Sequence, residues 1–189
     1  MTNRNNYAIQ ANQAKQHFLT YNQTALIQKL GLLFDENFLY VNLLCQPIRI
    51  DRTTAHMERQ VNGSWVDANR YEEVMTLLDL VCDSRENRTV SGRWMNMASF
   101  GLRFHQNMLE TQDARAQWIQ ADPERFRRAC SALGGIPEPG GDISYRFKFF
   151  EDLPVCIQFW FVSSIGISTN LSYFFQGFTV RSHSSLNPV

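Results

Sequence analysis

The side chains best placed for chemistry are one cysteine and one aspartate in the second half of the chain. Cys130 lies beside Arg127 and Arg128 in a predicted helix, and neighbouring cations lower the pKa of a thiol and activate it as a nucleophile. Asp142 follows a glycine-rich loop. Neither residue has a general base at a spacing known from a catalytic motif, so the catalytic residues stay unknown. For Cys130, a role in the hydrophobic core is the favoured interpretation.

Other reactive patterns are weak or missing. The four cysteines are isolated from one another, and without a CxxC pair the sequence predicts neither a metal site nor a cofactor. The glycine pairs before Asp142 could form an anion-binding nest, but no Walker lysine follows them, so a connector is favoured. Asp79 and Asp83 share one helical face, for which a solvated acidic surface is the favoured interpretation.

Charge and hydropathy argue against a nucleic-acid-binding, an exported and a membrane-spanning protein. The 189 residues carry 18 basic and 18 acidic side chains, and this zero net charge predicts no nucleic-acid partner. The N-terminus is polar, and polar residues interrupt the uncharged stretch 153–171, so we expect neither a signal peptide nor a membrane span. With scattered cysteines and no export signal, the sequence predicts a cytoplasmic location.

The first half of the chain alternates between helical and extended patterns. Apolar residues at helical spacing predict one helix over about 7–33 and a second over about 71–83. Between them, segments 38–44 and 48–51 are predicted to form a strand pair broken at Pro47, and Asn62-Gly63 is a turn signal.

The second half must form the core of a sheet. Of the 24 aromatic residues, 11 lie between Tyr145 and Phe178, and residues 143–150 and 153–162 have the pattern of a hairpin, with a third strand over 171–180. Before them, a helical pattern covers 102–118, and Asp122-Pro123 predicts the start of another helix whose buried face is Phe126, Ala129, Cys130 and Leu133.

Together these elements predict a fold class. We expect an α+β fold in which an antiparallel sheet has helices packed mainly on one face. The length suits a single domain over residues 1–189, with flexible tails at 1–6 and 182–189.

Three ordered segments of the chain resemble a family of bacterial and archaeal proteins of unknown function, DUF3786. They are the helix from Glu72 with the following 91–100 segment, the Phe126 to Asp142 region with its glycine pairs, and 153–160. The resemblance covers about 26–160 and implies no established activity or catalytic residues. Some relatives carry a cysteine-rich Fe–S segment, which hints at anaerobic redox or cofactor metabolism, but this chain lacks that segment.

The resemblance ends after Trp160. The family pattern continues with several acidic residues, whereas residues 161–170 contain none, so the C-terminus is divergent or altered. If those carboxylates bind a cation or a basic ligand in relatives, this chain is expected to lack that ability.

Two functions of different classes follow. The leading hypothesis is a non-enzymatic ligand- or protein-binding accessory module, which could form a homo-oligomer. The alternative is an enzyme of cofactor or one-carbon redox metabolism. The candidate site residues are Trp94, Phe100, Cys130, Asp142, Arg146, Trp160 and Tyr173.

Overall fold

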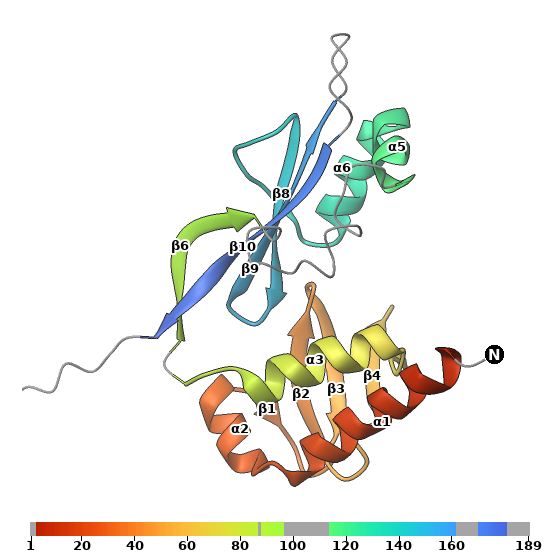
Figure 1. The fold of residues 1–189 in the computed structure, drawn as a ribbon, viewed down its shortest axis with the longest axis vertical. Coiled ribbons are helices and arrows are strands. Elements are labelled where there is room, and N and C mark those ends of the chain that lie inside the picture. The colour runs from red at the N-terminus through yellow and green to blue at the C-terminus, as the bar shows by residue number, and fades with distance from the viewer. Residues whose placement is uncertain (1–2, 87, 97–113, 162–169, 181–189) are drawn as a thin grey trace, which may run out of the picture. The chain divides into compact units, whose positions relative to one another are not determined.

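The computed structural model describes residues 3–86, 88–96, 114–161 and 170–180. The chain forms two compact units (Figure 1). Unit 1 is Met1–Thr89 with Thr179–Val189, and unit 2 is Val90–Phe178.

Unit 1 joins three helices to an antiparallel sheet. The strands follow the order β5-β4-β3-β2, and β1 also pairs with β2. The helices are α1 (Asn3–Thr20), α2 (Gln23–Leu30) and α3 (Tyr71–Asp83), and the strands are β1 (Leu33–Phe34), β2 (Phe38–Leu43), β3 (Gln46–Asp51), β4 (Met57–Val61) and β5 (Ser64–Asp67).

The core of unit 1 lies between one face of this sheet and the helices. Alternate residues of β2 and β3 are buried, because successive side chains of a strand point to opposite faces, and β4 adds the buried Met57. α1 and α3 lie across this face (Figure 1). The stripe predicted for α3 is confirmed, since its buried residues recur at helical spacing. The buried residues of these elements are Ala11, Phe18, Leu39, Val41, Ile48, Ile50, Met57, Val74, Leu77, Leu78, Val81 and Cys82.

The predicted helix over 7–33 is wrong, because the chain breaks between α1 and α2. Asn22 has an extended backbone, and its side-chain oxygen accepts a hydrogen bond from the N–H of Ala25 at 3.1 Å, which starts a new helix. Leu33 belongs to β1. α1 begins at Asn3 and therefore includes residues that were expected to be a flexible tail.

The break predicted at Pro47 is also wrong. Pro47 lies within β3 opposite Asn42, and the chain turns at Leu44 and Cys45, whose φ angles are 49° and 60°. Two consecutive residues with positive φ make a type I′ turn, whose twist matches that of the paired strands. The turn signal at Asn62-Gly63 is confirmed, since these residues connect β4 to β5.

Unit 2 contains the aromatic hairpin predicted from the sequence. Its strands follow the order β8-β9-β10-β6, and β7 pairs with β8. Its elements are β6 (Arg88–Asn96), α5 (Ala114–Ala121), α6 (Pro123–Ala132), β7 (Ile136–Pro137), β8 (Ile143–Phe150), β9 (Leu153–Trp160) and β10 (Asn170–Val180).

The helices of unit 2 cover one face of the β8–β9 hairpin. Their buried residues form one cluster with side chains that alternate along the two strands: Ala116, Ile119, Cys130, Ile143, Tyr145, Phe147 and Phe159. The face predicted for α6 is only partly right, because Cys130 is buried whereas Ala129 and Leu133 are exposed. The helix start is confirmed, since Asp122 accepts a hydrogen bond from the N–H of Arg125 at 2.9 Å.

The predicted α+β fold is confirmed. Each unit combines an antiparallel sheet with helices on one sheet face. The helix predicted over 102–118 falls largely outside the described residues, which show α5 from Ala114, and the predicted tail at 182–189 lies outside them as well.

The glycine-rich loop before β8 is hydrogen-bonded to the end of β9 through Asp142. Gly141 has a φ of 62°, and a Cβ added to it would lie 2.8 Å from the carbonyl oxygen of Phe159. Directly after it, the N–H of Asp142 donates to that same carbonyl at 2.9 Å, and the Asp142 carboxylate accepts from the N–H of Phe161 at 2.6 Å. The loop therefore needs glycine for two reasons, a left-handed backbone and a close approach to another strand.

Replacing Gly141 by alanine should destabilise the protein more than replacing Gly63. Gly63 also has a positive φ, of 81°, but a Cβ there would meet nothing within 4 Å. Gly63→Ala is expected to cost about 1 kcal/mol for the backbone conformation alone. Gly141→Ala should cost about 1–3 kcal/mol more because of the clash, measured as the free energy of unfolding in urea. Equal costs would contradict the close approach.

That the two units form a single domain stays a prediction, and unfolding tests it. If they form one cooperative domain, urea should unfold both in one transition. Of the four tryptophans, only Trp65 lies in unit 1. Within the wild type, and separately within Trp65→Phe, the midpoints from fluorescence and from far-UV circular dichroism should therefore coincide. Separate midpoints would show two independently stable domains.

Candidate functional site

Two of the predicted site residues meet at a carboxylate in unit 2. The indole Nε1 of Trp94 in β6 donates to Oε1 of Glu138 at 3.3 Å, and Nε of Arg146 in β8 lies 3.2 Å from Oε2 of the same residue. Glu138 follows β7, and its N–H donates to the carbonyl of Ser144 at 3.1 Å. The structure thus brings Trp94 and Arg146 together through a glutamate that the sequence analysis did not select.

This contact joins the two ends of the unit 2 strand order. β6 and β7 lie at opposite ends of the order β7-β8-β9-β10-β6, so four strand spacings of nearly 5 Å would separate them by about 19 Å in a flat sheet. A direct hydrogen bond between Trp94 and Glu138 requires the sheet to curl. Gly92, with a φ of 72°, lies within β6, which is a strongly curved strand in Figure 1.

The face of the hairpin that carries Arg146 also has a buried thiol. The Cys156 Sγ lies 3.3 Å from the hydroxyl of Ser144, and both residues are buried. Burial raises the pKa of the Cys156 thiol, although the Ser144 hydroxyl opposes that shift. A thiol with a raised pKa stays protonated at neutral pH and is a poor nucleophile.

Asp142 and Cys130 lie outside this group. Asp142 holds its loop to β9 as described above, and Cys130 lies in the core cluster beneath the helices. Desolvation on burial raises the pKa of the Cys130 thiol to about 11, so the nearby arginines do not activate it. Trp160 is half-buried at the end of β9, Tyr173 lies in β10 opposite Ile157, and Phe100 falls outside the described residues.

We call Trp94, Glu138, Arg146 and Cys156 the Glu138 group, and the reactions open to it are limited. Its carboxylate is held by an indole and a guanidinium, and its thiol is protonated and buried. Within the described part of unit 2, this arrangement offers no nucleophile paired with a base. Its contacts join the two ends of the unit 2 strand order.

A second concentration of aromatic side chains lies in unit 1, on the sheet face opposite α1 and α3. The guanidinium carbon of Arg49 lies 4.3 Å from the ring centroid of Phe38 and 4.6 Å from that of Trp65. Its Nη2 lies 2.6 Å from Oε2 of Glu58, and Tyr40 packs beside Trp65 with centroids 6.3 Å apart. We call these five residues the open face.

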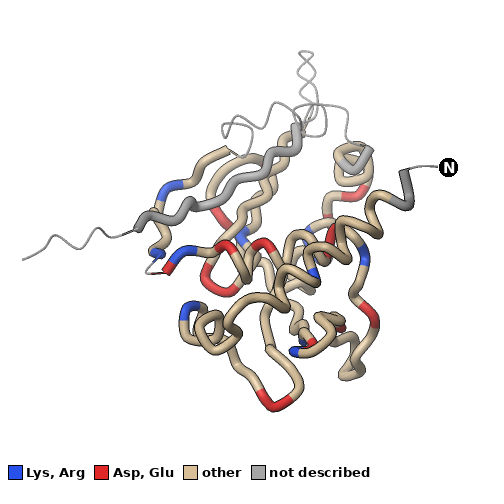
Figure 2. The backbone as a smooth tube through the Cα atoms, turned by 60° about the horizontal axis from the view of Figure 1, so that its bottom comes forward, with Lys and Arg blue, Asp and Glu red and all other residues tan. Residues whose placement is uncertain are grey.

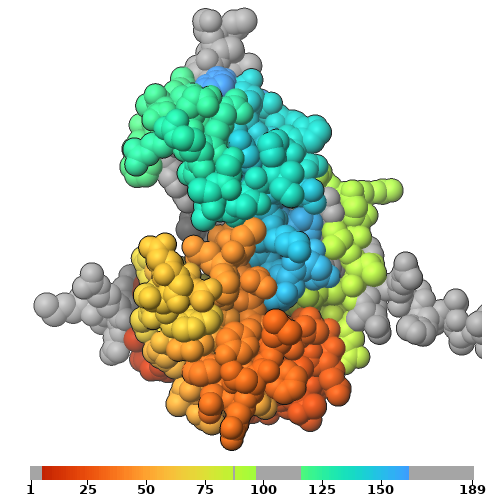
Figure 3. All heavy atoms as spheres, turned by 180° about the vertical axis from the view of Figure 1, so that it is seen from behind, coloured from red at the N-terminus to blue at the C-terminus, as the bar shows by residue number. Residues whose placement is uncertain are grey.

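Strand register places the members of the open face on one side of the sheet. Arg49 is opposite Tyr40 on β2 and Glu58 on β4, and Trp65 is opposite Gln60, two positions after Glu58. Side chains directly across neighbouring strands share a face, so the five residues form one layer. All five are partly exposed, and the strands of unit 1 reach the surface in Figure 3.

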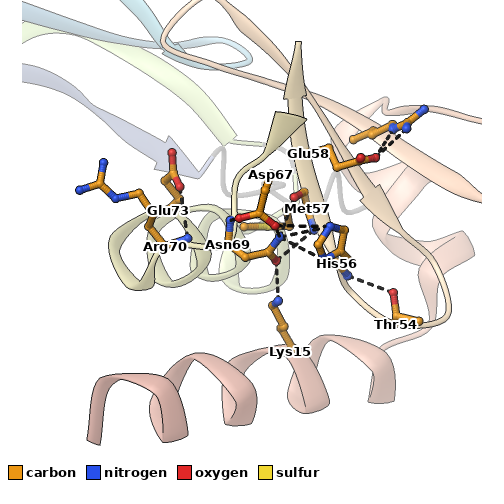
Figure 4. A network of polar contacts seen from close by, with 10 residues as sticks. Lys15, Thr54, His56, Met57, Glu58, Asp67, Asn69, Arg70 and Glu73 are labelled. Atoms are coloured by element: carbon orange, nitrogen blue, oxygen red, sulfur yellow. Dashed lines mark hydrogen bonds and ion pairs between the residues drawn. The ribbon is translucent and has the colours of Figure 1, made fainter. Parts of the chain in front are cut away.

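A polar cluster beside β5 holds the edge of unit 1 together (Figure 4). The side-chain Nδ2 of Asn69 donates to the carbonyl of Met57 at 2.8 Å and to Asp67 at 2.7 Å, while its Oδ1 accepts from the N–H of Met57 at 3.2 Å. Nζ of Lys15 donates to the same Oδ1 from α1. His56 completes the cluster, with Nε2 3.6 Å from Asp67.

This cluster has the residue types of a catalytic site, but its contacts serve to hold β4 and the segment after β5 together. We call it the Asn69 clamp. Desolvation lowers the pKa of Lys15, and the Coulomb attraction of Asp67 opposes that shift. The hydrogen bond from Asn69 is the largest of the interactions that lower the pKa of Asp67. Lysine, imidazole and carboxylate all meet at the Asn69 amide, which continues the β4–β5 pairing by bonding both backbone groups of Met57.

The sequence analysis missed Glu138 and the whole open face. A signal for the open face was available, because Phe38 and Tyr40 alternate along one strand and Trp65 follows a turn signal. The position of Arg49 between the rings depends on register across three strands, which no local pattern specifies. Glu138 had no comparable signal, since its two partners lie 44 and 8 residues away.

The chain belongs to the DUF3786 family, described as a domain of unknown function. The family model matches residues 23–163. Neither the curated proteins nor the solved structures include a match to this chain. The match ends at residue 163, so the whole of β10 lies outside it, although β10 pairs with β9 inside it.

Two features bear on the predicted classes of partner. Among the helices that the structure describes, none is long and apolar enough to cross a membrane. Over the described residues, acidic and basic side chains are interspersed along the backbone of both units (Figure 2).

The reactivity of the cysteines should follow their burial. Cys45 is exposed, whereas Cys82, Cys130 and Cys156 are buried. Iodoacetamide at pH 7.5 should alkylate Cys45 first, and Cys130 should react only after denaturation, as followed by peptide mass spectrometry. Cys45→Ser provides the control, in which labelling of the native protein should nearly disappear. Rapid native labelling of Cys130 would contradict its core position and restore it as a candidate nucleophile.

Removing the Asn69 amide should open the edge of unit 1. Asn69→Ala deprives the N–H of Met57 of its acceptor and removes one of the two donors to the Met57 carbonyl, and the expected loss of unfolding free energy is about 1–3 kcal/mol. Asn12→Ala, at an exposed position of α1, should cost less than about 0.5 kcal/mol. Urea denaturation measures both values, and similar small losses would show that the Asn69 clamp is dispensable.

Proposed function

We propose that the protein is a non-enzymatic, protein-binding accessory module that recognises its partner through the open face. The observation that carries this proposal is the layer of Phe38, Arg49 and Trp65 on a sheet face opposite the helices. Aromatic and arginine side chains dominate the energetics of protein interfaces, where they supply area, stacking and directed hydrogen bonds.

The two residues considered for an enzymatic reaction support the same choice. Cys130 is a buried thiol with a pKa raised to about 11, and Asp142 binds the backbone of Phe161. Both residues have positions that explain their presence without a reaction.

We also propose that the module acts in the cytoplasm. None of its four cysteines forms a disulfide. Exposed and buried thiols in one chain are typical of proteins in a reducing compartment.

Native mass spectrometry of protein purified from its own host tests the proposed function. Wild-type protein should retain a partner that Trp65→Ala loses, because the indole is both a contact surface and one side of the Arg49 stack. Trp118→Ala is the matched control: this tryptophan lies in unit 2 and is 72% exposed, and its removal should leave the complex intact.

Two results would contradict the proposal. One is a complex that survives Trp65→Ala, which would place the contact elsewhere. The other is a wild-type chain that purifies alone and turns over a small molecule, which would favour an enzyme.

A further inference from the structure

β5 is a sheet edge that can accept another strand. It pairs with β4 on one side and ends the strand order in unit 1, as far as the described residues show. Backbone N–H and C=O groups on such an edge form a template for pairing with an extended segment.

The hairpin geometry identifies the outward backbone groups of β5. Asn62 and Gly63, with φ angles of 49° and 81°, form the two-residue turn, so Val61 and Ser64 flank it as a hydrogen-bonded pair. Pairs alternate along an antiparallel ladder, which points the backbone groups of Trp65 and Asp67 away from β4. The bond from the N–H of Ala68 to the carbonyl of Met57 at 3.0 Å fits this alternation.

The side chains of Trp65 and Asp67 lie on the same side of the sheet as the open face. Trp65 and Asp67 are two positions apart on one strand, and Asp67 lies opposite Glu58. The side chain of Asp67 is 68% exposed. A strand paired with β5 would therefore present its own side chains, directly opposite these two, over an indole ring and a carboxylate.

The charge of this face selects a cationic partner. By register it carries three carboxylates, Asp51, Glu58 and Asp67, against one cation, Arg49. Two basic side chains lie near Asp67: Lys15 of α1, which donates to Asn69, and His56, whose Nε2 is 3.6 Å from the Asp67 carboxylate. An anionic segment would face like charges, and a second copy of the chain would bring its own Glu58 and Asp67 to the same edge.

We propose that β5 binds an extended, arginine-bearing segment of a partner protein by strand addition. This inference rests on the proposed function and specifies the partner. One arginine stacks on the outer side of Trp65, as Arg49 stacks on its inner side at 4.6 Å, and another pairs with Asp67. Arginine suits both positions, because its planar guanidinium stacks on aromatic rings and binds carboxylates through two donors.

The test uses the full chain and two synthetic hexapeptides, one alternating arginine with valine and one alternating glutamine with valine. Titrations followed by amide NMR should shift the Trp65 and Asp67 signals and slow exchange of their N–H groups. The arginine peptide should bind at least tenfold more tightly than the glutamine peptide. Trp65→Ala should weaken it about tenfold, whereas Trp118→Ala should leave its affinity unchanged.

Three outcomes would overturn the proposal. They are equal affinity for the two peptides, shifts confined to residues outside β5, and concentration-dependent shifts of Trp65 and Asp67 without peptide, which would identify a second copy as the occupant. If the arginine peptide fails while the native complex still depends on Trp65, the strand-addition inference is wrong and the proposed function stands. If neither depends on Trp65, both fail.

Discussion

The constraint on which unit 1 depends is that its described helices lie on one face of its sheet. The face toward α1 and α3 buries aliphatic residues such as Leu39 and Ile50, whereas the strands must cover the other face with their own side chains. Arg49 does so by filling the space between Phe38 and Trp65 while its donors reach Glu58. Each ring contact of this kind is worth about 0.5–1 kcal/mol at a partly exposed site. The same layer stabilises the sheet and leaves rings and carboxylates at the edge beside β5.

In unit 2 as well, the described helices cover one face of the sheet, and the sheet curls. α5 and α6 cover one face of the aromatic hairpin, and Trp94 reaches Glu138 across the other face. Gly141 and Asp142, two of the residues on which the family resemblance was based, have a physical role here. Gly141 allows the loop to approach Phe159, and Asp142 then binds the exposed N–H at the end of β9. In this chain the two residues therefore attach a loop to the end of a strand.

Local patterns in the sequence were sufficient to predict the fold class and several helices and strands. The α3 stripe depends on residues within thirteen positions, and Asp122-Pro123 caps its own helix, so both were predictable. The break at Asn22 was missed because its flanking apolar spacing continues across the cap. The site was less predictable, since Arg49 reaches its rings through register and Glu138 meets Trp94 through sheet curvature. For Cys130 a local pattern misled. The arginines next to it in the sequence suggested a lowered thiol pKa, whereas burial raises that pKa.

The central claim is that Arg49 is held between two aromatic rings on a sheet face. Ring currents test it directly, because protons above an aromatic ring resonate upfield. In the proton spectrum of the assigned protein, the side-chain protons next to the Arg49 guanidinium should be shifted upfield of those of exposed arginines such as Arg125 and Arg128. Trp65→Leu should remove part of that shift and leave Arg125 unchanged. Arg49 protons at ordinary positions, insensitive to Trp65→Leu, would contradict the account.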